Sequence, residues 1–267
     1  MGLFGKVRKI KNFVPAANLS AKKQVRLTPI QAGQPAANVS LINNNGVDFV
    51  KKVDSAVKLQ KDMGVGNRFD VIALIDESGS MGHLFRDGTV QAVTERALAW
   101  TAGVDADGMA PVGGFASGFK WHGEVDLSNV MGIVDREGWR TWGSTDLTAG
   151  LREAFEVAKQ ADNPVYLLVV TDGAPDHQAS VVQLVKEMSE YPIIIKFLLV
   201  GSDQRGKNFL EYVDDLEQHE PGGRLFDNVD TQHIVNVSSV SDDDFSKAMT
   251  EEVPEAIAAM RTAGLVI

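Results

Sequence analysis

Cysteine is absent from this chain of 267 residues. The absence excludes a disulfide scaffold, thiol catalysis, and zinc or iron–sulfur sites with cysteine ligands. Histidine is scarce, with five scattered copies at His83, His122, His177, His219 and His233. A metal site built from histidines is therefore disfavoured, and we expect any metal ion to be a hard cation held by oxygen atoms.

Long apolar runs are also missing. None approaches the roughly 18–20 residues that a membrane-spanning helix needs, so we expect no transmembrane segment. Apolar residues make up 44% of the chain and charged residues 23%, which is the composition of a soluble globular domain.

Acidic residues are absent from the first 47 positions, where seven basic residues stand. The other 220 residues carry all 36 acidic side chains and only 19 of the 26 basic ones. This acidic body disfavours general nucleic-acid binding, because the phosphate backbone needs basic side chains.

The basic N-terminal segment has an amphipathic pattern, since Leu3, Val7, Ile10 and Val14 recur at helical spacing. Two interpretations stay open: a helix that contacts a membrane surface or an acidic partner, and a helix that docks on its own domain or frays. Residues 15–46 are rich in Pro, Ala, Asn, Gln and Gly and predict a linker. Residues 48–63 predict a lead-in helix, so we expect an N-terminal extension over 1–67, with 1–46 dispensable for folding.

Strands and helices alternate over residues 68–267. Apolar runs predict strands at 69–75, 109–116, 119–124, 165–170, 193–200 and 224–228. Helical spacing predicts helices at 89–101, 147–161, 180–189, 209–216 and 243–262. This pattern is typical of an α/β domain of three layers, with a doubly wound, mostly parallel sheet covered on both faces.

Polar loops follow two of these strands, at the sheet edge where ligand sites form. The first strand leads into Asp76-Glu-Ser78-Gly-Ser80, and another ends in Thr171-Asp172-Gly173. Between them, Gly143-Ser-Thr145-Asp146 precedes a helix. Each loop alone has a structural explanation as a turn or helix cap, but three oxygen-rich loops together favour a metal site. Asp146 is interpreted as a cap of the next helix, the alternative being a third carboxylate at the metal.

These residues resemble the metal-ion-dependent adhesion site of a von Willebrand factor A (vWA) domain, with matching order and spacing over residues 68–235. A narrower resemblance is to bacterial TerF-like proteins of toxic-cation (tellurium) resistance and stress response. The segments that carry it are 57–61, 87–92, 105–108, 171–175, 226–228 and 259–267.

The resemblance implies a role for each of the five residues. Ser78 and Ser80 would ligate Mg²⁺ through their hydroxyls, and Thr145 would do so directly or through water. Asp76 and Asp172 would act mostly through water or as counter-charges. Mn²⁺ and Ca²⁺ are the alternative ions. The ion would keep an open position for an acidic group on a protein partner, and the protein would be a cytoplasmic binding module without enzymatic turnover.

Two enzyme alternatives remain. Gly201–Lys207 nearly fits a phosphate-binding loop, although Asn208 lacks the hydroxyl that binds Mg²⁺ and Asp203 would occupy the phosphate cradle. Asp76 would otherwise be a phosphatase nucleophile, but such enzymes usually have an acid at the position of Ser78.

Overall fold

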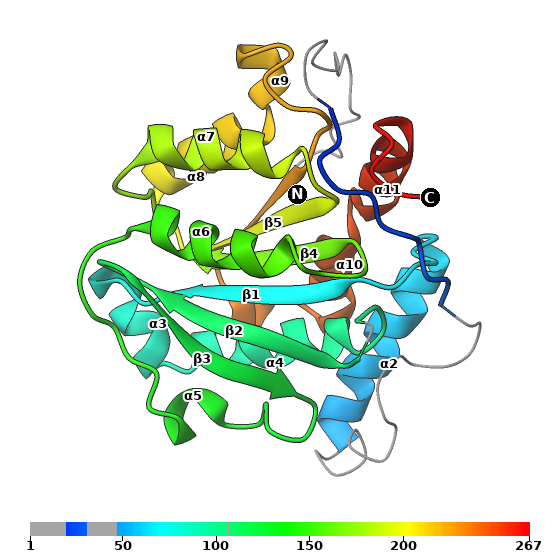
Figure 1. Ribbon diagram of the computed structural model, residues 1–267. Helices are drawn as coiled ribbons and strands as arrows, with labels where there is room; N and C mark the ends of the chain where they lie inside the picture. The colour runs from blue at the N-terminus through cyan, green and yellow to red at the C-terminus, as the bar shows by residue number, and fades with distance from the viewer. Residues whose placement is uncertain (1–19, 31–46, 106) are drawn as a thin grey trace.

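A six-stranded β-sheet runs through the centre of the protein (Figure 1). The computed structural model describes residues 20–30, 47–105 and 107–267. The strands are β1 (Asp70–Asp76), β2 (Met109–Phe115), β3 (Phe119–Asp126), β4 (Val165–Thr171), β5 (Ile193–Val200) and β6 (Val229–Ile234). Their order is β3-β2-β1-β4-β5-β6, and every neighbouring pair is parallel except β2 with the edge strand β3.

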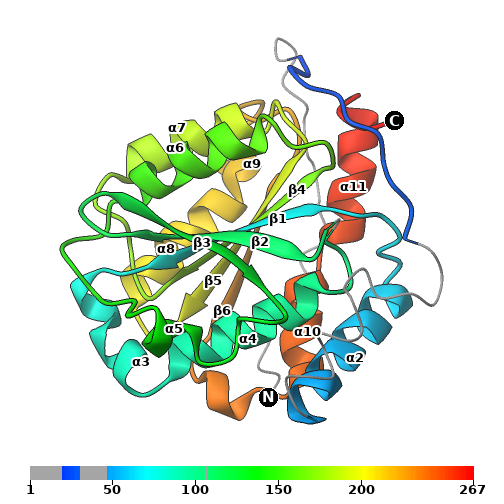
Figure 2. The same cartoon turned by 60° about the horizontal axis from the view of Figure 1, so that its bottom comes forward.

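Helices cover both faces of this sheet (Figures 1 and 2). The α-helices are α2 (Val47–Asp62), α3 (Gly82–Arg86), α4 (Thr89–Thr101), α5 (Ile133–Arg136), α6 (Leu147–Ala158), α7 (Gln178–Met188), α8 (Gln204–Asp214), α9 (Leu216–His219), α10 (Asp242–Thr250) and α11 (Val253–Thr262). Two short 3₁₀ turns are η1 (Gly79–Met81) and η2 (Val237–Ser239). The predicted three-layer α/β fold is confirmed.

Alternate residues of each central strand belong to two separate cores. In β4, Leu167 and Val169 pack with α6, α7 and α8, whereas Leu168 and Val170 pack with α2, α4, α10 and α11. Both faces of the strand are therefore apolar, which explains the continuous apolar runs in the sequence. The order of connections reverses between β1 and β4, so the crevice at the carboxyl ends of these two strands is the expected ligand position.

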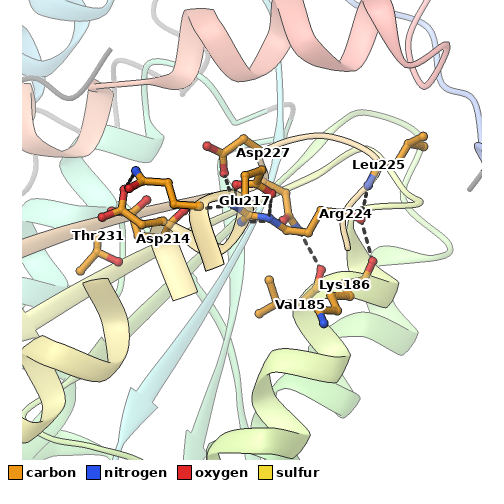
Figure 3. Close-up of polar contacts among 12 residues, drawn as sticks. Val185, Lys186, Asp214, Glu217, Arg224, Leu225, Asp227 and Thr231 are labelled. Atoms are coloured by element: carbon orange, nitrogen blue, oxygen red, sulfur yellow. Dashed lines mark hydrogen bonds and ion pairs between the residues drawn. The ribbon is translucent and has the colours of Figure 1, made fainter. Parts of the chain in front are cut away.

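A buried arginine corrects one predicted strand. Residues 224–228 form no strand, and β6 begins at Val229 instead. The fully buried Arg224 pairs with Glu217 and Asp227, and it donates a hydrogen bond of 3.0 Å to the Asp214 carbonyl (Figure 3). Its neighbour Leu225 donates its N–H to the Ser189 hydroxyl rather than to a strand. This network fixes the segment before β6 in an irregular conformation.

The predicted terminal helix over 243–262 is two helices. The break lies between Thr250 and Val253, where Glu252 has a φ of +65° and Pro254 opens α11. Proline fits the first turn of a helix but cannot continue one, because it has no N–H.

Part of the predicted linker belongs to the domain. Residues 20–30, here called the strap, run beside the C-terminal residues. Val25 is buried and pairs in parallel with Val266, and its N–H and carbonyl bond to Leu265 and Ile267. The prediction of a linker is therefore wrong for the strap, and these contacts argue against the expectation that this part of residues 1–46 is dispensable. Helix α2 also packs into the core through Phe49 and Val53. The boundary at residue 68 stays a prediction, and the basic segment 1–14 lies outside the described residues.

Within the described residues, no helix has the length and apolar character needed to cross a membrane.

Candidate metal centre at the carboxyl ends of β1 and β4

Asp76 closes the first loop and ties it to β4. It is the last residue of β1, and its side chain is fully buried. Its Oδ1 accepts a hydrogen bond of 2.8 Å from the Ser78 N–H, which curls the chain into η1. Its Oδ2 accepts one of 2.6 Å from the Thr171 hydroxyl at the end of β4. The carboxylate thus holds the two loops together at the place where the order of strand connections reverses.

A chain of hydroxyls links this loop to the second carboxylate. Ser80 donates its hydroxyl to Asp172 Oδ1 at 2.7 Å, and the Ser78 and Ser80 oxygens lie 3.1 Å apart. The single hydroxyl proton of Ser80 is used in the bond to Asp172, so Ser78 is the donor in the bond between the two serines. Four of the five predicted residues are therefore joined by hydrogen bonds at one edge of the sheet.

Thr145 lies on the neighbouring loop, which is tied to the first one. The Gly79 N–H donates to the Gly143 carbonyl at 3.1 Å. Gly143 has a φ of +89°, and a β-carbon there would lie 2.2 Å from the Ser117 hydroxyl, so the position requires glycine. Thr145 itself donates its N–H to Asp176 Oδ2, at 3.1 Å. The fifth residue is thus placed by its loop rather than by a bond to the serines.

In the absence of a cation, burial disfavours the ionised form of both carboxylates. It raises the pKa of Asp76 to about 6 despite the hydrogen bonds from Thr171 and Ser78. Burial also raises the pKa of Asp172, and the nearby Asp203 adds to that effect. No ion pair with lysine or arginine is found for either group among the described residues. Two such carboxylates beside two converging hydroxyls are a donor set that fits a hard divalent cation.

Carboxylates and histidines alone would not have revealed this centre. Across residues 20–30, 47–105 and 107–267, no three His, Cys, Asp or Glu side chains gather in a way that could hold a metal. The candidate centre has two carboxylates and takes its other oxygens from hydroxyls, so its assignment rests on the loops as a set.

Two residues of the centre were missed in the sequence. Thr171 bonds to Asp76, and its hydroxyl beside Asp172 was the available signal. Glu77 sits between two predicted ligands with its carboxylate fully buried. No local sequence pattern indicates this burial, because the partners of Glu77 come from β3 and from residue 142.

Asp146 is a helix cap, as predicted. It is the N-cap of α6, and its Oδ1 accepts a hydrogen bond of 3.2 Å from the Ala149 N–H. Its carboxylate is thus engaged with the first turn of the helix.

The geometry does not favour the enzyme alternatives. Lys207 lies inside α8 and pairs with Glu211 at 2.6 Å, while Asp203 caps the same helix through the Gly206 N–H. A phosphate cradle would need that helix end free for an anion. Asp76 is buried and both its oxygens accept hydrogen bonds, so it is poorly placed to attack a substrate.

A hollow adjoins the candidate centre. It has a volume of about 770 Å³ and includes Asp172 in its wall. Its other walls are residues 83–89, the loop after β5 and the segment after β6. The hollow gives a side chain from another molecule room to approach Asp172.

The sequence of residues 68–266 matches one protein family, described as the vWA domain found in the C terminus of TerF. The chain belongs to the vWA-TerF-like family. The match covers the whole sheet and all three loops of the candidate centre. The predicted family resemblance is thereby confirmed.

Among curated proteins, this vWA-TerF-like chain is similar to the uncharacterized protein YcbR of Bacillus subtilis strain 168. The two are 26% identical over 201 residues, which cover 72% of this chain and 79% of YcbR.

The chain is also similar to solved structures at low sequence identity. VWA2 of Sulfolobus acidocaldarius, a paralog of ArnB, is 14% identical with a TM-score of 0.40, over 68% of this chain and 43% of that one. Manganese-loaded TRAP protein of Plasmodium vivax is 14% identical with a TM-score of 0.46, over 74% of each chain. Mussel byssus proximal thread matrix protein 1, with a zinc-occupied MIDAS motif, is 18% identical with a TM-score of 0.41, over 72% of this chain and 48% of that one.

Proposed function

We propose that this vWA-TerF-like chain binds a divalent cation, foremost Mg²⁺, and through it an acidic side chain of a protein partner. The observation that carries the proposal is the hydrogen-bonded chain from Asp76 through Ser78 and Ser80 to Asp172. It brings two buried carboxylates and two hydroxyls together, and in the part of the chain that the structure describes no lysine or arginine forms an ion pair with either carboxylate.

Thr145 would complete this ligand set from the neighbouring loop. Mg²⁺ takes about six oxygens and keeps several waters, so one coordination position would stay exchangeable. An Asp or Glu side chain of the partner would replace a water there and form a charge-assisted contact. The hollow beside Asp172 would accommodate the residues that flank this side chain.

The wider role that we propose is that of a cytoplasmic binding module in a bacterial or phage-borne system of toxic-cation (tellurium) resistance or stress response. The support for this role is the family membership over residues 68–266. We propose no turnover, and incubation with ATP and with a phosphomonoester should therefore give no Mg²⁺-dependent release of phosphate.

Thermal unfolding with and without metal tests the cation site. A ligand that binds only the folded state at 100 times its Kd adds about 2.7 kcal/mol, which corresponds to roughly 5–10 °C in Tm for a domain of this size. Mg²⁺ or Mn²⁺ should raise the Tm of the wild type, and the double variant Ser78→Ala with Ser80→Ala should lose this shift. Ser55→Ala on α2 is the control that should keep it. A shift that survives the double substitution would place the metal elsewhere.

A further inference from the structure

Glu77 carries a fully buried carboxylate between two predicted metal ligands. An unpaired buried charge is costly, so such a group needs close partners. Its Oε1 accepts a hydrogen bond of 2.9 Å from His122 Nε2, and its Oε2 accepts one of 2.8 Å from Trp142 Nε1. Lys120 Nζ lies 3.3 Å from the same Oε2. We call these four residues the Glu77 brace.

The brace joins three separate segments of the chain. Glu77 belongs to the first loop, Lys120 and His122 to the edge strand β3, and Trp142 to the segment that leads to Thr145. The backbone adds a second tie, because the Trp142 N–H donates to the Glu77 carbonyl at 2.7 Å. Two bonds therefore fix residue 142 to residue 77.

The surroundings of the brace are shaped to hold it. His122 stacks on the buried Trp139, with ring centroids 4.4 Å apart and planes at 22°. A β-carbon on Gly114 would lie only 2.4 Å from Glu77 Oε2 and 2.7 Å from His122 Nε2. Glycine in β2 thus leaves the space that the carboxylate and the imidazole occupy.

The three partners of the carboxylate favour its ionised form, because two are hydrogen-bond donors and Lys120 is a cation. Burial by itself raises the pKa of Glu77, but the hydrogen bonds from His122 and Trp142 and the positive charges of His122 and Lys120 together hold it below its ordinary value. Hydrogen bonds to an ionised carboxylate are shorter and stronger than neutral ones.

From this geometry we infer that Glu77 is a positioning residue, which fixes the serine loop and the Thr145 loop relative to each other and so sets the affinity of the metal centre. The inference rests on the proposed function, since it concerns the same cation. Glu77 does not contact the ion in this scheme; it acts through Ser78 on one side and through Trp142 on the other. Residues that orient metal ligands in this way commonly change metal affinity by about 10–100-fold when they are replaced.

Trp142→Phe is the decisive variant, because it removes the indole N–H while the net charge around the centre stays the same. Its matched control is Trp121→Phe. Trp121 is equally exposed, at 38% against 37%, but its ring packs on Phe119 instead of contacting Glu77. Titration calorimetry with Mn²⁺ should show about a tenfold or greater loss of affinity for Trp142→Phe and wild-type affinity for Trp121→Phe.

A double-mutant cycle separates positioning from simple electrostatics. Glu77→Gln removes both the charge and part of the brace. If Glu77 and Trp142 act through one contact, the double variant Glu77→Gln with Trp142→Phe should bind Mn²⁺ with about the affinity of whichever single variant binds it less tightly. If the two residues act independently, the fold-losses of affinity of the two single variants should instead multiply in the double variant. Should Glu77→Gln fail to fold, as shown by its metal-free melting curve, the comparison of the two tryptophan variants decides alone.

The outcomes distinguish the positioning role of Glu77 from the proposed function. Wild-type Mn²⁺ affinity in Trp142→Phe, or multiplying effects in the cycle, would overturn the positioning role and leave the proposed function intact. A wild type that binds no Mn²⁺ would overturn the proposed function and the positioning role together.

Discussion

Ser80 and Asp172 are 92 residues apart in sequence, yet the serine hydroxyl donates a hydrogen bond of 2.7 Å to the carboxylate. The bond joins the loop after β1 to the loop after β4, across the point where the order of strand connections reverses. It also orients the second carboxylate toward the hydroxyls of the first loop. The candidate centre depends on this contact between two loops.

Asp172→Asn should abolish metal binding without loss of metal-free stability. The amide oxygen can still accept the bond from Ser80, while the charge that would balance the cation is gone. A buried carboxylate with a raised pKa is a cost to the metal-free protein, so its removal should leave the metal-free Tm equal or slightly higher. Thermal melts with Mg²⁺ and with a chelator measure both effects.

Thr145→Ala should weaken Mg²⁺ binding less than Asp172→Asn, because it removes a neutral ligand instead of a charge. Its metal-dependent shift in Tm should be reduced but present. A loss as complete as that of Asp172→Asn would show that the threonine hydroxyl is as essential to the ion as the carboxylate.

The strap should contribute to stability. Val25 is 5% exposed and pairs with the C-terminal residues, so Val25→Ala should lower the free energy of unfolding by about 1–3 kcal/mol. Arg26→Ala, on the exposed neighbour, is the matched control and should change it by less than about 0.5 kcal/mol. Urea unfolding measures both, and equal effects would mean that the strap packs less tightly than the contacts of Val25 indicate.

Three partly buried acids, Asp214, Asp227 and Glu252, should make metal-free stability fall as pH rises. Burial raises the pKa of Asp227 to about 7, with Arg224 opposing the rise. Burial also raises the pKa of Glu252 and brings that of Asp214 well above its ordinary value. The unfolded groups titrate near pH 4. Between about pH 4 and 7 the native state therefore binds more protons than the unfolded state, and stability decreases with rising pH.

Urea unfolding in chelator between pH 5 and pH 8 measures this dependence, for which we expect a total decrease of roughly 1–3 kcal/mol. Asp227→Asn should give a shallower decrease, because one of the raised groups is gone. Asp76 and Asp105 also have raised pKa values and should keep some slope in the variant. An unchanged slope would mean that Asp227 is not among the groups that titrate on folding.

Lys207→Met should have no effect on metal binding or phosphate release, and a change in stability below about 0.5 kcal/mol. Its ammonium pairs with Glu211 on the exposed side of α8. Asp203→Ala should instead cost about 1 kcal/mol, because it removes the cap of that helix. Mg²⁺-dependent hydrolysis of ATP that is lost in Lys207→Met would revive the phosphate-loop alternative.

The sequence alone determined the α/β class and most of the candidate centre. Strands that are buried on both faces appear in the sequence as continuous apolar runs, and amphipathic helices show apolar residues at a spacing of about three to four. The alternation of strands and helices over residues 68–267 can therefore be predicted from short stretches of sequence. The order of strands then brings the loops with Asp76 and Asp172 to one edge. The five candidate ligands could be named because loops at strand ends carry their polar residues in short, contiguous motifs.

Only the tertiary structure decided the features that join distant segments. Lys196 stands inside the buried strand predicted over residues 193–200, and its ammonium is buried against Asp230 and the Ala248 carbonyl. Val25 was assigned to a linker because its partner, Val266, lies at the other end of the chain. Glu77 has no distinguishing feature in the sequence, because its hydrogen-bond partners come from β3 and from Trp142. A buried charge or an isolated pairing depends on partners far away in sequence, and local composition and periodicity carry no information about them.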